Sequence, residues 1–157
     1  ENIALLQPEV LGLEAFPTPG HASHHACYLG PDGMLYAGDA AELLAWAPAQ
    51  SLARIDLIHP DPWPKRRHWK RRFVQDATVA AMARILRAAG EFRFVSDIDD
   101  YCAWTLAHLI RSPDFVWTAE RAVDWQKPWD GYTMTRYGRK AEREGRVAAY
   151  LRFRRSG

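Results

Sequence analysis

Apolar residues in this chain change their spacing several times, and this alternation limits the fold more than any other feature. Short apolar runs typical of buried strands are separated by segments in which apolar residues recur at helical spacing. Strands are expected at residues 10–14, 34–36, 54–58, 91–96, 115–118 and 147–153. Helices are expected at residues 40–47, 73–86, 99–110 and 134–144. Strands that alternate with helices predict an α/β sandwich with a mostly parallel sheet.

Local signals refine this prediction. Residues 17–33 contain three prolines and three glycines, a density that predicts an irregular loop. Gly90 is expected to end the preceding helix in the left-handed conformation. The last two strands, joined by an irregular connection, indicate an antiparallel edge near the C-terminus. No repeat or linker interrupts the 157 residues, so we predict one domain over residues 1–157.

The basic residues are clustered, although the net charge is only +2. Of the 21 Lys and Arg residues, six lie within 65–72 and eight lie from Arg136 to Arg155. Two basic clusters on a nearly neutral body indicate a phosphate-rich partner.

The cysteines and the hydropathy argue against several other classes of protein. Cys27 and Cys102 occur without a Cys-x-x-Cys motif or a secretory signal, so we interpret both as free thiols in the reducing cytoplasm. No apolar run approaches the ~18 residues that a membrane span needs. His21, His24 and His25 lie too close to Cys27 to close a usual four-ligand zinc site, so no metal is predicted.

Acidic residues are expected at the ends of four strands. They are Glu14, Asp39, Asp61 and Asp97. In open α/β sheets ligands bind outside the carboxyl ends of the strands. Carboxylates there can accept hydrogen bonds from ribose hydroxyls, an amino group or a base edge. The alternative interpretation is that each acid caps the helix that follows it.

The segment Pro60-Asp61-Pro62-Trp63-Pro64 is stiff, because three prolines restrict five consecutive residues. Trp63 can stack on a base, or it can pack in the core. The cations that follow are candidates for phosphate contacts: Lys65, Arg66, Arg67, Lys70, Arg71 and Arg72, with His68 among them. The alternative is a solvated helix start, which the helix dipole and the repulsion among like charges disfavour.

A second candidate site lies near the C-terminus. Hydroxyl and guanidinium groups follow one another closely there, at Thr133, Thr135, Arg136, Tyr137, Lys140, Arg143 and Arg146. Such groups suit a sugar, a phosphate or a base edge. The alternative is a polar surface helix.

The segment HPDPWPKRRHWKRRFVQ at 59–75 resembles the most specific motif of the bacterial tRNA (guanine-N7)-methyltransferases. Further segments match in the same order, at 36–44, 95–101 and 133–145, and 11–16 resembles an acid-bearing strand. The resemblance implies a class I (Rossmann-like) methyltransferase sandwich. It also implies transfer of a methyl group from S-adenosylmethionine to N7 of a guanine in the variable loop of tRNA, in the cytoplasm. The sequence leaves open whether the chain is a monomer or a homodimer.

The resemblance implies a role for each matched residue. Contacts with S-adenosylmethionine are implied for Glu14, Asp39, Ala40 and Asp61, and Asp61 is also the implied catalytic acid. Contacts with the target guanosine are implied for Lys65, Asp97, Thr135, Arg136 and Tyr137. Contacts with RNA are implied for Arg67, His68, Lys70, Arg71 and Arg72.

The chain departs from the family pattern in two places that bear on function. The family's first strand and its glycine-rich cofactor loop have no counterpart, so we expect a chain truncated at its N-terminus. Gly138 stands where the family motif Thr-Lys-Phe-Glu carries its acid. An alternative function is therefore a non-catalytic tRNA-binding module that no longer binds S-adenosylmethionine.

Overall fold

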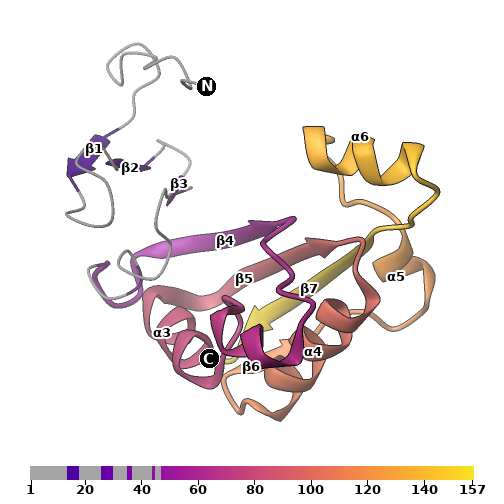
Figure 1. The fold of residues 1–157 in the computed structure, drawn as a ribbon. Coiled ribbons are helices and arrows are strands. Elements are labelled where there is room, and N and C mark those ends of the chain that lie inside the picture. The colour runs from indigo at the N-terminus through magenta and orange to yellow at the C-terminus, as the bar shows by residue number, and fades with distance from the viewer. Residues whose placement is uncertain (1–13, 18–25, 30–34, 37–43, 45–46) are drawn as a thin grey trace.

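The computed structural model describes residues 14–17, 26–29, 35–36, 44 and 47–157. Residues 47–157 contain a four-stranded sheet with the order β4-β5-β7-β6 (Figure 1). These strands are β4 (Leu52–Ile58), β5 (Leu86–Ser96), β6 (Phe115–Trp117) and β7 (Ala149–Arg155). β4 and β5 are parallel, whereas β7 is antiparallel to both β5 and β6. The expected antiparallel edge is therefore the pair β6–β7, with the last strand inserted between β5 and β6.

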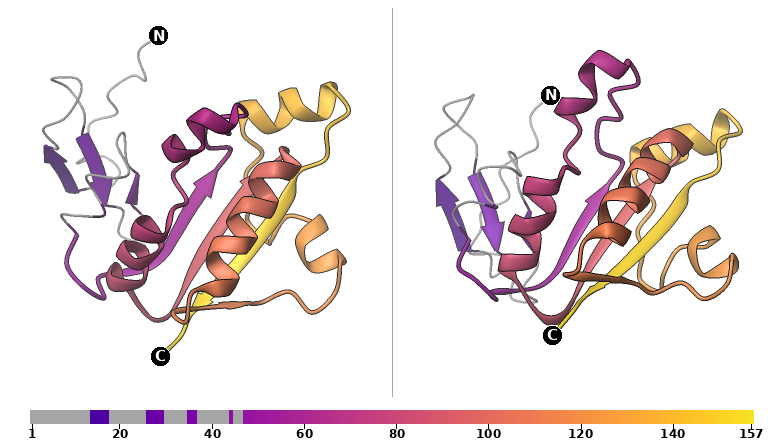
Figure 2. Two further views of the ribbon diagram at one scale, coloured as in Figure 1. Left: turned by 60° about the horizontal axis from the view of Figure 1, so that its bottom comes forward. Right: turned by 90° about the horizontal axis from the view of Figure 1, so that it is seen from below.

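The described helices lie on one face of this sheet, at one of its ends and beside β7. They are η1 (Arg66–Arg71), a 3-10 helix, and α3 (Asp76–Ile85), α4 (Asp99–Arg111), α5 (Val123–Gln126) and α6 (Arg136–Arg143). α3 and α4 cover one face of the sheet (Figure 1). η1 and α6 both lie at the end of the sheet where β4 and β5 terminate (Figure 2). That end is the one where ligands bind in open α/β sheets.

A separate antiparallel sheet has the order β1-β2-β3. Its strands are β1 (Glu14–Pro17), β2 (Ala26–Leu29) and β3 (Leu35–Tyr36). The prediction of an irregular loop over 17–33 is wrong for Ala26–Leu29, because these residues pair with both neighbouring strands. Of the strand expected at 10–14, only Glu14 lies within the described residues. Of the helix expected at 40–47, Leu44 is described as helical and Ala47 forms a bend.

Side chains alternate along β5 between the helix-covered face and the opposite face. Phe92 and Phe94 are fully buried in the core against α3 and α4. Glu91 and Arg93 point the other way, and Glu91 accepts hydrogen bonds from Arg93 (2.5 Å) and from Arg152 of β7 (3.2 Å). The alternation expected at 91–96 is thus confirmed, and it fixes which face holds the core.

The helix expected at 73–86 is shorter, since α3 begins at Asp76 and ends at Ile85. Gln75 is its N-cap, and the Gln75 N–H donates to the Thr78 hydroxyl at 2.9 Å, forming a capping box. The prediction that Gly90 ends this helix is wrong. Gly90 lies inside β5, where an added Cβ would come within 2.8 Å of the Arg87 carbonyl oxygen. Ala89, with φ 59°, lies in the same strand, in the irregular stretch between the pairs Leu52–Leu86 and Arg54–Glu91.

The described helices include none with the length and apolar character that crossing a bilayer requires. Within the same residues no three His, Cys, Asp or Glu side chains are grouped so as to hold a metal ion. His21, His24 and His25 lie outside the described residues.

The thiol of Cys102 is predicted to be unreactive in the folded protein. Cys102 is buried in α4, and its Sγ donates to the Ser96 carbonyl at 3.5 Å. Burial, aided by the charges of Asp99 and Asp97, raises the pKa of this thiol to about 12. The thiolate is the reactive form, so a protonated, enclosed thiol reacts slowly.

This prediction is measured in a Cys27→Ser variant, in which Cys102 is the remaining cysteine. We expect the reaction with an aromatic disulfide reagent at pH 8 to be at least about 100-fold slower in buffer than in 8 M urea. Similar rates in the two solutions would show that α4 exposes Cys102.

Candidate functional site

The turn that leaves β4 has an uncommon backbone conformation at both of its ends. His59 has φ 48° and Trp63 has φ 43°, values that non-glycine residues seldom adopt. Between them, Pro60 and Pro62 restrict the chain on either side of Asp61. Residues in such conformations persist when surrounding contacts hold them, and they gather at functional sites.

His59 and Asp97 join the carboxyl ends of β4 and β5. His59 directly follows β4, Asp97 directly follows β5, and the two strands are parallel neighbours. His59 Nδ1 lies 3.2 Å from Asp97 Oδ1, and the His59 side chain is 4% exposed. Arg146 Nε donates to the other carboxylate oxygen of Asp97 at 2.5 Å. Asp97 thus lies at the strand end where the sequence predicts it, held from two sides.

The charge of Asp97 is secured by these two partners. Burial raises the pKa of its carboxyl group, but the hydrogen bonds from Arg146, from its own backbone N–H and from His59 together outweigh burial, so the pKa lies below its ordinary value. Asp97 is therefore ionised at neutral pH and can accept further hydrogen bonds.

Asp61 is exposed at the tip of the turn. It forms no ion pair with any residue of the part of the chain that the structure describes. Its charge acts on Tyr101 in α4: burial, and to a smaller extent Asp61, raise the pKa of the Tyr101 hydroxyl. The Asp61 carboxylate is thus available to a ligand at the carboxyl end of the sheet.

The residues that follow the turn form an exposed basic surface, which we define as Lys65, Arg66, Arg67, Lys70 and Arg71. The half-buried Trp63 is its aromatic neighbour. The Arg71 guanidinium lies 4.9 Å from the centre of a Trp63 ring, and His68 meets Trp63 edge-on at 5.8 Å. The cation–π contact holds Arg71 beside the turn, so the basic surface borders Asp61.

The structure contradicts the prediction that Arg72 contacts RNA. Arg72 is only 2% exposed, its Nε donates to the Pro62 carbonyl at 2.9 Å, and it pairs with Asp100 of α4. Three aromatic rings lie 4.8–5.1 Å from its guanidinium carbon, those of Trp69, Tyr101 and Trp104. Arg72 therefore links the turn at Pro62 to Asp100 of α4 through buried contacts, and it does not belong to the basic surface.

α6 begins at the second candidate segment. Thr135 is its N-cap, and the Thr135 hydroxyl accepts a hydrogen bond from the Gly138 N–H at 3.0 Å. Arg136 and Tyr137 are exposed on the first turn. Gly138 is buried because α6 packs closely on the strand ends: an added Cβ would clash with Met134 Sδ and lie 3.2 Å from His59 Nε2. The absence of a side chain at Gly138 lets α6 rest on His59.

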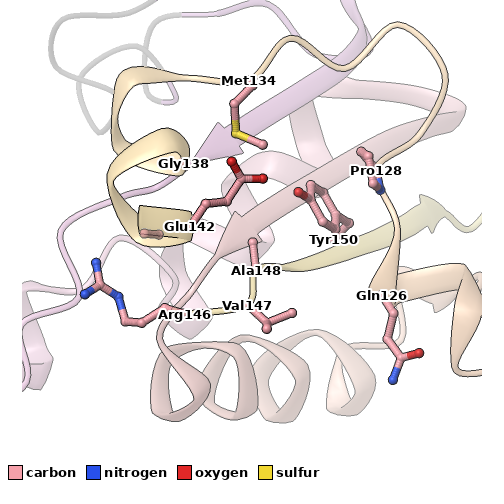
Figure 3. A pocket seen from close by; sticks show the side chains of 10 residues that line it. Gln126, Pro128, Met134, Gly138, Glu142, Arg146, Val147, Ala148 and Tyr150 are labelled. Atoms are coloured by element: carbon pink, nitrogen blue, oxygen red, sulfur yellow. The ribbon is translucent and has the colours of Figure 1, made fainter. Parts of the chain in front are cut away.

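A cavity of about 300 Å³ lies beside α6 (Figure 3). Its walls come from the end of α5 and the segment after it, from α6, and from the connection between α6 and β7 with the start of β7. They are formed by Gln126, Pro128, Met134, Gly138, Ala141, Glu142, Arg146, Val147, Ala148 and Tyr150. Arg146 belongs both to the cavity wall and to the Asp97 pair, so the cavity opens next to the strand ends.

The structure brings only part of the predicted site together. Asp97 and Thr135 lie around the His59 contact, and Asp61 lies at the tip of the turn beside Lys65, Arg67, His68, Lys70 and Arg71. Asp39 and Ala40 fall outside the described residues. Glu14 begins β1 and does not end a strand, contrary to the prediction.

Sequence reasoning missed that His59 connects the ends of β4 and β5 through its contact with Asp97. It also missed the cavity residues Met134, Glu142 and Tyr150. His59 carried a usable signal, since it directly follows the strand at 54–58. The cavity residues carried none, because they come together only when α6 folds back over β7.

The arrangement defines a class of protein. β4, β5 and β6 run in one direction, and the last strand, β7, is inserted antiparallel between β5 and β6. Polar residues lie at the carboxyl ends of β4 and β5. This is the Rossmann-like α/β fold of class I methyltransferases. Residues 34–151 match the sequence profile of a family described as putative methyltransferase. The match covers well over half of the chain, which therefore belongs to this methyltransferase family.

Several curated relatives share high sequence identity with the chain. A protein of Rhodopseudomonas palustris (strain BisB18) is 83% identical over 122 residues, which are 78% of this chain and 49% of the relative. A protein of Bradyrhizobium diazoefficiens is 81% identical over 122 residues, 78% of this chain and 52% of the relative. Both are named tRNA (guanine-N(7)-)-methyltransferase. The chain spans about half the length of these relatives.

Proposed function

We propose that the chain acts as a tRNA guanine-N7 methyltransferase, with S-adenosylmethionine as methyl donor and tRNA as substrate in the cytoplasm. The observation that carries this proposal is the exposed Asp61 carboxylate at the end of β4, bordered by the basic surface. The names of relatives more than 80% identical to the chain agree with it.

The basic surface supports a polyanionic substrate. Five cations lie exposed within one short segment, and repulsion among them would favour separation in the absence of an anion. Lys and Arg contacts to phosphates supply sequence-independent affinity for nucleic acid. The neighbouring cavity supplies a place for one base, and Arg146 in its wall is paired with Asp97.

The residues that the structure describes fit S-adenosylmethionine at one position. Asp61 offers a carboxylate without an ion-pair partner in the described part of the chain, next to the strand ends. We propose that Asp61 holds the cofactor together with Glu14, Asp39 and Ala40. The cofactor supplies a methyl group on a positively charged sulfur.

The chemistry requires mainly positioning. Guanine N7 has an in-plane lone pair, so it can accept a methyl group without first losing a proton. The chain's task is then to align the base and to exclude water. Positive charge develops on the base as N7 is methylated, and an ionised Asp61 nearby stabilises it.

The test of this function is a product assay. The chain is incubated with a tRNA transcript and methyl-labelled S-adenosylmethionine, and the tRNA is digested to nucleosides. We expect 7-methylguanosine, and none from a transcript with adenosine at the variable-loop position. Binding of tRNA without methylation, and without heat on titration with S-adenosylmethionine, would instead support a non-catalytic tRNA-binding module.

The basic surface yields a prediction for tRNA affinity. Arg71→Ala removes one exposed guanidinium beside Trp63. We expect weaker tRNA binding, with the slope of log K against log salt concentration reduced by about one. Fluorescence anisotropy across a salt series measures the slope. Arg87→Ala, an exposed cation at the opposite end of β5, is the control and should leave it unchanged.

A further inference from the structure

The cavity beside α6 is lined by a solvent-exposed carboxylate, that of Glu142. Glu144, two residues further along, pairs with Lys140 and Arg146. Glu142 forms no ion pair within the described part of the chain. Figure 3 shows its carboxylate at the cavity, between Met134 and Tyr150.

The electrostatics of the cavity agree with this position. Burial, and next the charge of Glu142, raise the pKa of the Tyr150 hydroxyl. Burial is the main cause that raises the pKa of Tyr132, and Glu142 is a smaller one. Arg146, the cation in the cavity wall, is engaged with Asp97 and Glu144. The acceptor that the cavity wall offers to a ligand is therefore the Glu142 carboxylate, which favours a ligand that presents hydrogen-bond donors.

The other walls favour a flat, apolar ligand. Tyr150 is held edge-on against Trp129 and Tyr132, with ring centres 6.1 Å and 5.2 Å apart. Met134 adds a polarisable thioether that adapts to aromatic surfaces. The volume of about 300 Å³ lies at the lower end of the range for small-molecule sites.

We propose that Glu142 is the specificity-determining residue of a guanine pocket, accepting hydrogen bonds from N1–H and the 2-amino group of the base. Guanine presents these two donors side by side, and one carboxylate can accept both. Adenine presents an acceptor at N1, which the carboxylate repels. Gly138 has no side chain that could accept these hydrogen bonds.

This inference rests on the proposed function for its substrate, but its test does not require catalysis. The chain is labelled with ¹³C at its methionine methyl groups and titrated with guanosine 5′-monophosphate or inosine 5′-monophosphate. Met134 reports the cavity, and the fully buried Met82 is the internal reference. The two nucleotides share the phosphate and differ only in the 2-amino group.

We expect the guanine nucleotide to shift the Met134 signal and to bind about tenfold more tightly than the inosine nucleotide. In Glu142→Gln the guanine nucleotide should bind about tenfold more weakly, and the preference over inosine should fall below about threefold. Glu120→Gln, an exposed acid away from the cavity, is the matched control and should keep the preference.

An unmoved Met134 signal, or an unchanged preference in Glu142→Gln, would overturn the inference. Its failure is distinguishable from failure of the proposed function. A guanine preference without 7-methylguanosine formation rejects methyl transfer and leaves the pocket standing. Product formation with an unchanged preference in Glu142→Gln rejects the role of Glu142 alone.

Discussion

Asp61→Asn is expected to lower the rate of methyl transfer to tRNA about 10²–10³-fold, while tRNA affinity changes less than about twofold. The substitution keeps the shape of the side chain and removes its charge. That charge is exposed and without an ion-pair partner in the described part of the chain, so its loss leaves the turn's own contacts intact. Effects of this size are typical when one electrostatic contact to a reacting group is removed, about 3–4 kcal/mol.

Single-turnover methylation with saturating tRNA isolates the chemical step from binding. Asp114→Asn is the control, because this exposed acid precedes β6 at the opposite end of the sheet. It should leave the rate unchanged. An Asp61→Asn variant that methylates at the parental rate would remove Asp61 from the mechanism, and a large loss of tRNA affinity would assign Asp61 to the fold of the basic surface.

Arg72→Ala is expected to lower the free energy of unfolding by about 3 kcal/mol. The substitution empties a space lined by Trp69, Tyr101 and Trp104 and leaves the Pro62 carbonyl without its donor. The neighbouring Arg71→Ala should cost less than about 0.5 kcal/mol, since Arg71 is exposed.

Urea unfolding followed by tryptophan fluorescence compares the two variants under one set of conditions. Arg72→Met, which retains most of the buried stem, should recover part of the loss. A cost below about 1 kcal/mol for Arg72→Ala would mean that the aromatic cluster closes over the space. Arg71 and Arg72 would then contribute similarly to stability, although Arg72 is buried and Arg71 is exposed.

The identical charges of Arg71 and Arg72 explain why sequence alone could not separate them. Within 65–72 all six cations looked suited to phosphate, and burial is set by α4, whose residues come some 30 positions later. The local pattern did predict the positions of β4, α4 and the alternation of β5, because spacing of 2 or 3.6 residues is a local property. It overestimated the helix over 73–86, because Gln75 and Thr78 cap it later than its apolar residues begin.

Gly90 shows another limit of local signals. A glycine after a helix favours a left-handed terminator, yet at this position the backbones of Arg87 and Ala53 approach so closely that only hydrogen fits. Part of this requirement is the contact with Ala53 of β4, a tertiary contact that no window around Gly90 contains. The same holds for the cavity, where α6 and β7 bring Glu142 and Tyr150 together through the turn between them.

The place of β7 has a consequence for how this molecule is made. β6 has β7 as its partner in the four-stranded sheet, and β7 spans residues 149–155. During synthesis on the ribosome, β6 must therefore wait with its backbone groups unpaired until these late residues leave the exit tunnel. Because β7 lies between β5 and β6, the four-stranded sheet cannot be completed before residues 149–155 are free to pair.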